Sequence, residues 1–263
     1  MPRIPLPSAA VFLTTGSTLS KKIAKILLPL GFWLFLWGVA ASLVGQEFVL
    51  PGPVRVFTVL LELAGQGAFW RTVLLSMARM VGGILGGALL GMALAVLGWV
   101  SPWLERLFAP AVRVIRAVPV ASFILLVLLW VERGWVPVAV SALMVLPVVW
   151  AAVRQGLAAA DPQLLELARC YRMSRWKIIR LVYLPALAPA FSAGLATAMG
   201  LAWKSGVAAE VLCTPKVGLG TEIYWARQAL ESPELFAWTI TVVVLSLLME
   251  QIVERLLKRG EAV

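Results

Sequence analysis

The chain alternates between long apolar runs and short polar or proline-rich stretches. The first run covers residues 26–45 (ILLPLGFWLFLWGVAASLVG). About 20 apolar residues, each rising about 1.5 Å along a helix, cover the roughly 30 Å hydrocarbon core of a bilayer. Further apolar runs follow at roughly 70–99, 117–131, 135–154, 185–209 and 235–256. The pattern predicts an all-α integral membrane protein with six transmembrane helices.

The composition agrees with this class. Hydrophobic residues make up 61% of the chain and charged residues 14%, against about 45–50% and about 25% in soluble domains. The net charge of +10 could indicate nucleic acid binding, but the basic residues lie mostly in short loops, which is a membrane topology signal. We therefore expect a lipid bilayer and no nucleic acid as partner. The chain has no histidine, the commonest metal ligand, and no metal site is expected.

The basic residues are distributed unevenly between the two sides of the predicted membrane. Six spans put both termini on one side, which collects 16 lysines and arginines against 6 on the other. This count treats residues 101–116 as a loop on the basic side. The positive-inside rule then places both termini in the cytoplasm. Residues 1–25 contain no apolar core followed by a cleavage site, so we expect a cytoplasmic segment there, a transmembrane domain over 26–256 and a cytoplasmic tail at 257–263.

One basic, amphipathic stretch lies between the fourth and fifth apolar runs, DPQLLELARCYRMSRWKIIRLVYLPALAP. Asp161 suits a helix N-cap and Pro162 suits the first helical position. Ser174 can cap a second helix, and Pro185 marks the entry to the next span. The pattern predicts a helical hairpin over 161–184, on the cytoplasmic membrane surface, that docks onto a soluble partner.

At this point the sequence resembles the membrane subunits of type I ATP-binding-cassette (ABC) importers. Their cytoplasmic signature is Glu-Ala-Ala, three residues, Gly, nine residues, then Ile-x-Leu-Pro. The residues in register are Glu166, Ala168, Val182, Leu184 and Pro185, while Leu167 replaces the first alanine and Arg172 replaces the glycine. Because that glycine normally permits the turn between two coupling helices, either the turn here is built differently or the first helix runs on through Met173.

Other pieces extend the resemblance, which looks closest to the nitrate/sulfonate/taurine-type permeases. They are LPGPVRVF (50–57), SMARMVGGILGGALLG (76–91), RAVPVASF (116–123), LAWKSGVAAEVL (201–212) and GLGTEIYWA (218–226). The resemblance implies the type I permease fold in a bacterial inner membrane. It also implies a second permease copy in a homodimer, two ATPase subunits that bind ATP and Mg, and an external substrate-binding protein. The chain itself is expected to be no enzyme and to hold no cofactor, because GLAWKS (200–205) has Trp203 where a Walker A motif needs glycine.

The resemblance also implies a set of residues that couple the permease to its ATPase: Glu166, Ala168, Arg169, Arg172, Met173, Ser174 and Pro185. Glu166 would position its helix in a groove of the ATPase through a charge-assisted bond. The alternative is a solvated surface acid.

Charged residues within the spans are candidates for the translocation pathway, since an unpaired charge there costs at least about 2.5–3.5 kcal/mol. They are Arg79, Lys204 and Glu210. Lys204 could attract an anionic substrate, form a structural pair with Glu210, or extend its charged end toward the membrane surface (snorkelling). Six residues separate the two by about 240° around a helix, so such a pair would form across a dimer interface. Gly218 and Gly220 are expected to form a tight turn that supports an outer gate, and Gly83, Gly87 and Gly91 share a face suited to close helix packing.

Function follows from the resemblance as an expectation: import of a small anion such as a sulfonate, taurine or nitrate. Bicarbonate or a thiamine-precursor pyrimidine is the alternative substrate. A membrane enzyme would need clustered acids, bases or metal ligands at one depth, which the sequence lacks. A passive channel is a distant alternative, and it should be indifferent to charge replacement at Glu166.

Overall fold

The computed structural model describes residues 28–260, with the side chains of 254 and 256–260 left aside, and this part of the chain contains helices and no strand. The helices, in chain order, are Leu28–Val44, α2 (Pro53–Ala64), α3 (Gly67–Val100), α4 (Pro102–Ala117), α5 (Val120–Val127), α6 (Val136–Ala158), α7 (Pro162–Cys170), α8 (Arg175–Ile178), the π-helix η1 (Ile179–Tyr183), α9 (Leu184–Cys213), α10 (Leu219–Gln228) and α11 (Ser232–Gly260). The predicted segment 1–25 lies outside the described residues, as do 261–263 of the predicted tail.

The predicted all-α membrane fold is confirmed. Four stretches of helix are long and apolar enough to cross a bilayer: α3, α6, Arg175–Cys213 and Ser232–Val253. The bent pair α4 and α5 passes the same test when it is taken together. The first predicted span falls on the apolar helix Leu28–Val44, and its residues 26 and 27 lie outside the described range.

The third span differs from the prediction. Residues 101–116, expected as a cytoplasmic loop, form α4, which bends by 110° into α5. Pro119 accounts for the break, because proline disfavours helical backbone at the preceding residue, and Val118 is extended. The prediction took the three arginines of this stretch for loop residues. Their spacing of seven and three residues instead places them on one exposed face of a helix: Arg106, Arg113 and Arg116.

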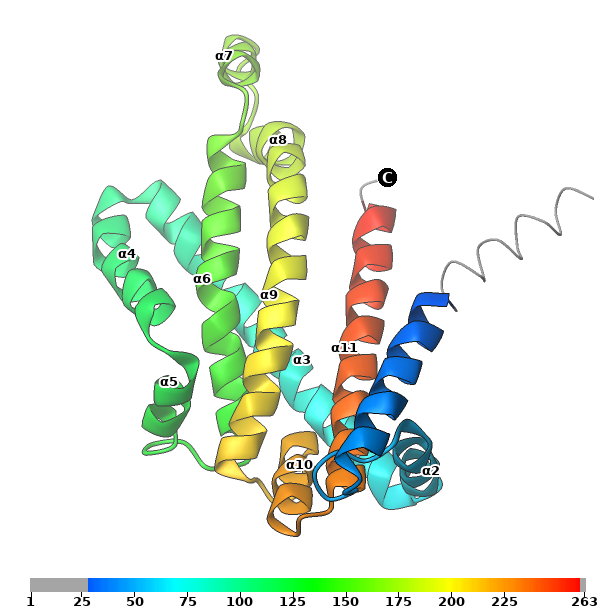
Figure 1. Ribbon diagram of the computed structural model, residues 1–263. Coiled ribbons are helices and arrows are strands. Elements are labelled where there is room, and N and C mark those ends of the chain that lie inside the picture. Colours follow the sequence, from blue (N-terminus) through cyan, green and yellow to red (C-terminus); the bar gives the residue numbers. More distant parts are fainter. Residues whose placement is uncertain (1–27, 261–263) are drawn as a thin grey trace, which may run out of the picture.

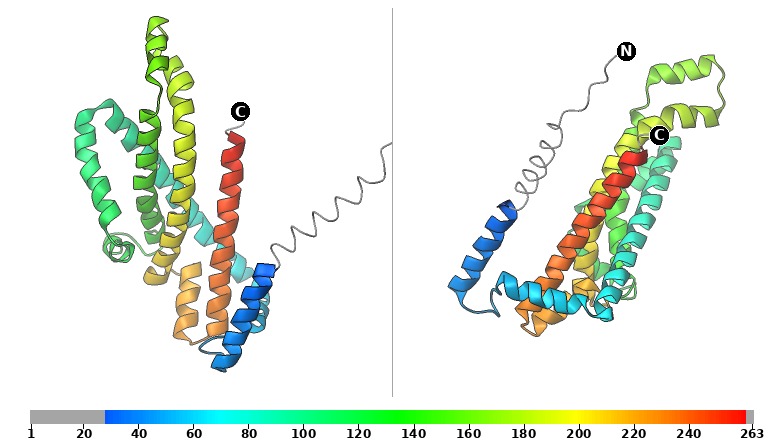
Figure 2. Two further views of the ribbon diagram at one scale, coloured as in Figure 1. Left: turned by 45° about the horizontal axis from the view of Figure 1, so that its top comes forward. Right: turned by 90° about the vertical axis from the view of Figure 1, so that its right-hand side faces the viewer.

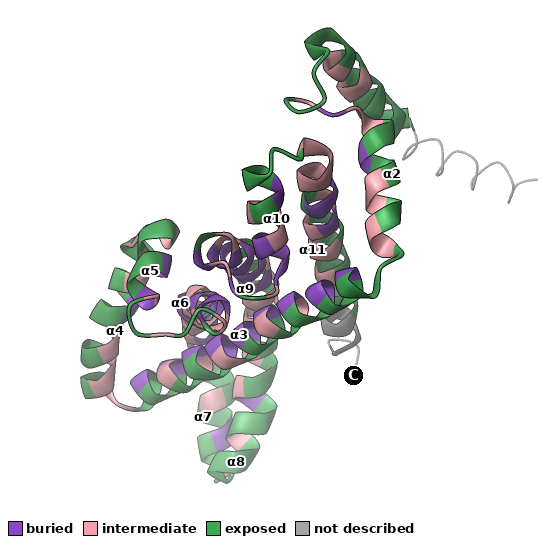
Figure 3. Cartoon of the chain, turned by 90° about the horizontal axis from the view of Figure 1, so that it is seen from below, coloured by how far each residue is buried: buried purple, intermediate pink, exposed green. Residues whose placement is uncertain are grey.

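Helix α6 lies between α3 and α9 and packs against both, and buried residues gather on these three helices (Figure 3). The predicted glycine face of α3 is confirmed as a packing surface. A Cβ on Gly83 or Gly91 would lie 2.6 Å from the Ser141 Cβ or the Leu146 carbonyl oxygen of α6. Glycine is therefore needed here for space, because real side chains do not approach this closely.

The hairpin of α7 and α8 projects from one end of the molecule, and α10 and α2 lie at the other (Figure 1). The C-terminal end of α11 lies toward the hairpin end in both figures that show the full ribbon (Figures 1 and 2). The helix Leu28–Val44 stands at the side of α11, where Trp37 stacks on Phe236 with ring centroids 5.9 Å apart.

Candidate functional site

The hairpin turn keeps the geometry that the signature glycine would allow. Helix α7 ends at Cys170 and does not continue through Met173. The Met173 N–H donates to the Ala168 carbonyl at 2.9 Å, and the Arg172 N–H donates to the Arg169 carbonyl at 3.0 Å, which is the Schellman pattern. Arg172 has φ of 48°, the left-handed conformation that glycine adopts freely. The ordinary turn is thus formed with an arginine in the glycine position.

The two helices of the hairpin differ in how their N-termini are capped. Asp161 caps α7 as predicted, since its side chain accepts a hydrogen bond of 2.8 Å from the Gln163 N–H. Ser174 takes the N-cap position of α8 without a side-chain cap bond. The predicted second helix is interrupted by a π-helical turn, in which the Leu184 N–H reaches back five residues to the Ile179 carbonyl. This turn falls on the signature positions just before Pro185, and such π-turns are frequent at functional sites.

Most of the predicted coupling residues are free to meet a partner. Glu166, Arg169, Arg172, Ser174 and Pro185 are exposed, Met173 is half-buried, and Ala168 is buried in the turn. Glu166 makes no hydrogen bond or ion pair within the described part of the chain.

An ion pair supports the end of the bundle from which the hairpin projects. Arg154 of α6 donates a 2.7 Å hydrogen bond to Glu105 of α4. Its guanidinium also lies 5.8 Å from the Trp99 ring centroid and 5.7 Å from that of Trp150. Gly98 leaves room for the carboxylate, because a Cβ there would collide with Glu105. Arg154 is one of the 16 basic residues counted on the cytoplasmic side, and its pairing with Glu105 was not predicted.

Near the opposite end, two of the predicted pathway residues, Arg79 and Glu210, join one buried network. The Glu210 side chain is fully buried. It accepts hydrogen bonds from Arg79 at 3.0 Å, from the Ser76 hydroxyl at 2.8 Å and from the Gly220 N–H at 3.1 Å. The Ser76 oxygen in turn accepts a 2.9 Å bond from the Leu219 N–H. The carboxylate therefore ties α3 and α9 to the N-terminus of α10, where the helix dipole also favours negative charge.

Gly218 and Gly220 leave room for the atoms of this network, and neither residue makes a tight turn. A Cβ on Gly218 would lie 2.8 Å from Glu210 Cδ, and one on Gly220 would lie 2.5 Å from the Val211 nitrogen. Gly218 is extended, with φ of 174°, which any residue adopts. The turn itself is made by Thr214, whose φ of 42° is left-handed.

Lys204 is not part of the network. The structure pairs Glu210 with Arg79, whereas Lys204 is exposed on another face of α9. Two polar residues of these helices were missed by the sequence analysis, Ser76 and Glu250. Both carried a signal: Ser76 lies one turn before Arg79, and Glu250 is the first charged residue of the last predicted span. Glu250 is exposed on α11 beside Gly200 of α9.

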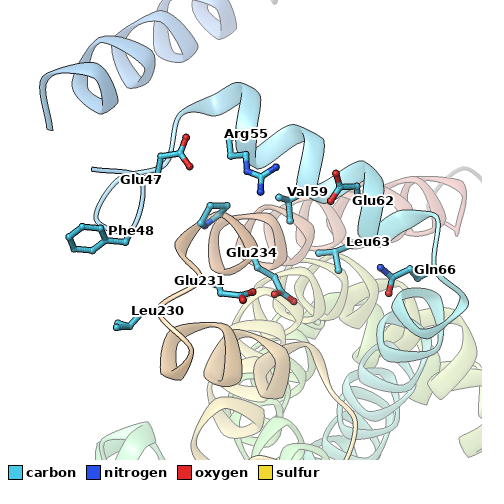
Figure 4. Close-up of a pocket in the computed structure, with 11 residues that line it drawn as sticks. Glu47, Phe48, Arg55, Val59, Glu62, Leu63, Gln66, Leu230, Glu231 and Glu234 are labelled. Atoms are coloured by element: carbon cyan, nitrogen blue, oxygen red, sulfur yellow. The ribbon is translucent and has the colours of Figure 1, made fainter. Parts of the chain in front are cut away.

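A separate hollow of about 600 Å³ lies at the end opposite the hairpin (Figure 4). Its lining contains one arginine, Arg55, and four carboxylates: Glu47, Glu62, Glu231 and Glu234. The lining of this hollow is therefore mainly acidic, and Lys204 is not part of it.

Comparisons with known proteins agree with the fold. Residues 83–260 match the family described as "Binding-protein-dependent transport system inner membrane component", and the chain belongs to this family. It is therefore an ABC importer permease, a membrane component of a transport system whose chain crosses the bilayer several times.

Individual relatives cover most of the chain. The riboflavin transport system permease protein RibX of Chloroflexus aurantiacus is 29% identical over 89% of this chain and 90% of its own. SsuC of Bacillus subtilis, named for aliphatic sulfonates transport, is 31% identical over 85% of this chain and 81% of its own. A structure of the MetNI methionine ABC transporter in an inward-facing conformation has a TM-score of 0.63 at 16% identity, covering 73% of this chain and 95% of the other. At that identity the last comparison shows the fold alone.

Proposed function

We propose that this chain forms the translocation pathway of an ABC importer as a homodimer and couples it to ATP hydrolysis by two partner ATPase subunits. The observation that carries the proposal is the projecting hairpin, which keeps the signature turn and presents Glu166, Arg169 and Arg172 to solvent. ATP and Mg are bound by the partner. ATP-driven closure of the partner dimer draws the two hairpins together and opens the pathway outward, and hydrolysis resets it.

The expected orientation places the hairpin and both termini in the cytoplasm of a bacterial cell. The acidic hollow and α10 then face outward, toward an external substrate-binding protein. The buried Glu210 network supports the outer-gate role expected for Gly218 and Gly220, because its hydrogen bonds join α10 to α3 and α9.

The proposed substrate is a small anion such as a sulfonate, taurine or nitrate. Lys204 supports a substrate with negative charge, since it is exposed within a span and makes no ion pair in the described part of the chain. Relatives named for riboflavin and for aliphatic sulfonates match this chain about equally well, so similarity does not choose among substrates. Bicarbonate or a thiamine-precursor pyrimidine is the second candidate.

Charge replacement at Glu166 tests the coupling. We expect Glu166→Lys to reduce co-purification with the ATPase partner and ATP-driven uptake by about tenfold or more, because a bond to a charged group is worth about 1.5–3 kcal/mol. Glu132→Gln, in the exposed turn before α6, is the matched control and should leave both unchanged. Transport that is indifferent to Glu166 would favour a passive channel, and sustained ATP hydrolysis by the purified chain alone would contradict the assignment.

A further inference from the structure

Helix α4 carries three arginines into the membrane. Together with α5 it is long and apolar enough for one bent span, although its residues were expected in a cytoplasmic loop. All three side chains are exposed: Arg106, Arg113 and Arg116. We call them the arginine flank of α4.

The ion pair between Arg154 and Glu105 fixes the level from which α4 descends. Arg154 lies one turn before the end of α6 at Ala158. From Glu105 onward, α4 runs back along α6 in the opposite direction (Figures 1 and 2). Arg113 and Arg116 lie about 12 and about 16 Å further along α4, at about 1.5 Å per residue. In a hydrocarbon core of roughly 30 Å, both arginines are therefore near the middle.

The exposed surface of α4 has two flanks of different chemistry. At about 100° per residue, the three arginines fall within an arc of about 80°. The large apolar side chains form a second flank, centred about 110° from the first. They are Trp103, Leu107 and Val114, which are 68%, 55% and 61% exposed. Only the second flank suits lipid, so the arginine flank faces something else.

The arginine flank has no counter-charge in the part of the chain that the structure describes. None of its three side chains makes an ion pair or a hydrogen bond there. Charged groups at this depth are costly in lipid, and they face water-filled cavities or partners instead. The flank therefore borders either water or an acidic surface of another chain.

A second copy of this chain has too few acids to neutralise the flank. Four acids lie in the described spans, and two of them, Glu105 and Glu210, already form ion pairs. Glu234 lies near the start of α11, at the end opposite the hairpin. Only Glu250 is left among these four for three arginines. Water is thus the surrounding that fits most of the flank.

We propose that the arginine flank of α4 lines the water-filled translocation pathway and acts there as an electrostatic barrier to cations. Arginine is not deprotonated in proteins, so the barrier is permanent. Basic side chains repel cations from the pores that they line. The pathway can then open without letting small inorganic cations leak through. This inference rests on the proposed function and adds to it the helix α4, whose arginines are not among the pathway candidates named above.

The test compares two neighbouring positions of α4, one on each flank. Arg113→Cys and Val114→Cys are each made in a Cys170→Ser background, in which the buried Cys213 is the remaining natural cysteine. Inverted membrane vesicles with the permease and its ATPase are treated with an anionic reagent, sulfonatoethyl methanethiosulfonate, or with a cationic one, trimethylammonioethyl methanethiosulfonate. Each rate is divided by the rate of the same reagent with a free thiol in solution. Because the reactive thiolate forms in water and is disfavoured in apolar surroundings, the rates report water and its local charge.

We expect Arg113→Cys to react at least about tenfold faster than Val114→Cys. At Arg113→Cys the anionic reagent should have about a tenfold higher normalised rate than the cationic one, because two arginines remain nearby. Adding Arg106→Gln and Arg116→Gln should remove this preference. ATP with vanadate, which holds the partner dimer closed, should slow the reaction from the cytoplasmic side, because the pathway then opens outward. Arg116→Cys replaces Arg113→Cys if that variant does not assemble with the ATPase.

Three results would overturn the inference. The first is an equally slow reaction at both positions, which would place the arginine flank against lipid or protein. The second is equal normalised rates of the two reagents at Arg113→Cys, which would mean that there is no barrier. The third is a rate unchanged by ATP with vanadate, which would place this position on an open surface outside the pathway.

ATP hydrolysis separates this inference from the proposed function. It is measured on the Cys170→Ser complex with and without Glu166→Lys. Hydrolysis that requires Glu166 upholds the coupling role of the hairpin, so a negative labelling result then removes only the role of α4. Loss of that requirement would count against the proposed function itself.

Discussion

Single residues decide two local structures in this chain. At the hairpin, Arg172 adopts the left-handed backbone that the family signature assigns to glycine. Toward the end opposite the hairpin, Glu210 accepts hydrogen bonds from Arg79, Ser76 and the start of α10. The first residue carries strain and the second carries buried charge, so their replacements should act in opposite directions on stability.

Arg172→Gly should stabilise the protein. The left-handed conformation costs a non-glycine residue about 1–2 kcal/mol, and glycine removes this cost. Glycine also gives the unfolded chain more conformational freedom, which reduces the gain in stability by about 0.5–1 kcal/mol. We therefore expect a net gain of about 0.5–1 kcal/mol, seen as a higher melting temperature in detergent. Arg175→Gly, at the start of α8 in ordinary helical backbone, is the control and should not stabilise. Coupling to the ATPase should survive Arg172→Gly, and its loss would mean that the guanidinium contacts the partner.

Breaking the buried pair should destabilise strongly. Glu210→Leu leaves Arg79 without its counter-charge, and removing one partner of a buried pair costs about 3–5 kcal/mol. The double variant Arg79→Met with Glu210→Leu should recover part of this loss, because no unpaired charge remains. Melting temperatures of the two single variants and the double variant form the measurement. Additive losses would show that the two side chains do not interact.

At the scale of elements, the hydrophobic pattern located most spans because apolar length is a direct physical requirement of the bilayer. It failed at α4, where Arg106, Arg113 and Arg116 looked like loop charges although helical spacing puts them on one face. The hairpin register could be read from Glu166 to Pro185, whereas its π-turn could not, since the turn depends on how α8 joins α9. Glu210 was recognised as a candidate, but its partner Arg79 lies 131 residues away and no local pattern joins them.

The glycine face of α3 offers a matched pair of tests. Gly87→Ala should overpack the contact with α6, because its Cβ would collide with Ala142 and lie 2.8 Å from the Val145 Cβ. Such overpacking costs about 1–3 kcal/mol. Gly86→Ala, the next residue along, meets nothing within 4 Å and should be neutral or slightly stabilising, since alanine favours helix. Equal effects on melting temperature would contradict the packing interpretation.

At the scale of the whole molecule, two natural cysteines report the orientation in the membrane. Cys170 is exposed on the hairpin and Cys213 is buried at the opposite end of α9. We expect a membrane-impermeant maleimide to label Cys170 in inverted vesicles and not in intact spheroplasts, because the proposed orientation puts the hairpin in the cytoplasm. Cys170→Ser should abolish the signal, as Cys213 is inaccessible. Labelling of Cys170 in intact spheroplasts would reverse the proposed topology.

The pairing of Arg79 with Glu210 also bears on how the chain is made. Arg79 leaves the ribosome 131 residues before Glu210, an interval of about 7–26 s at ordinary synthesis rates of about 5–20 residues per second. During that time Arg79 has no counter-charge, and an unpaired arginine in a span costs at least about 2.5–3.5 kcal/mol. Helix α3 therefore reaches its full stability only after α9 has been made. The final packing of α3 is then a late event in biosynthesis, timed by the emergence of Glu210.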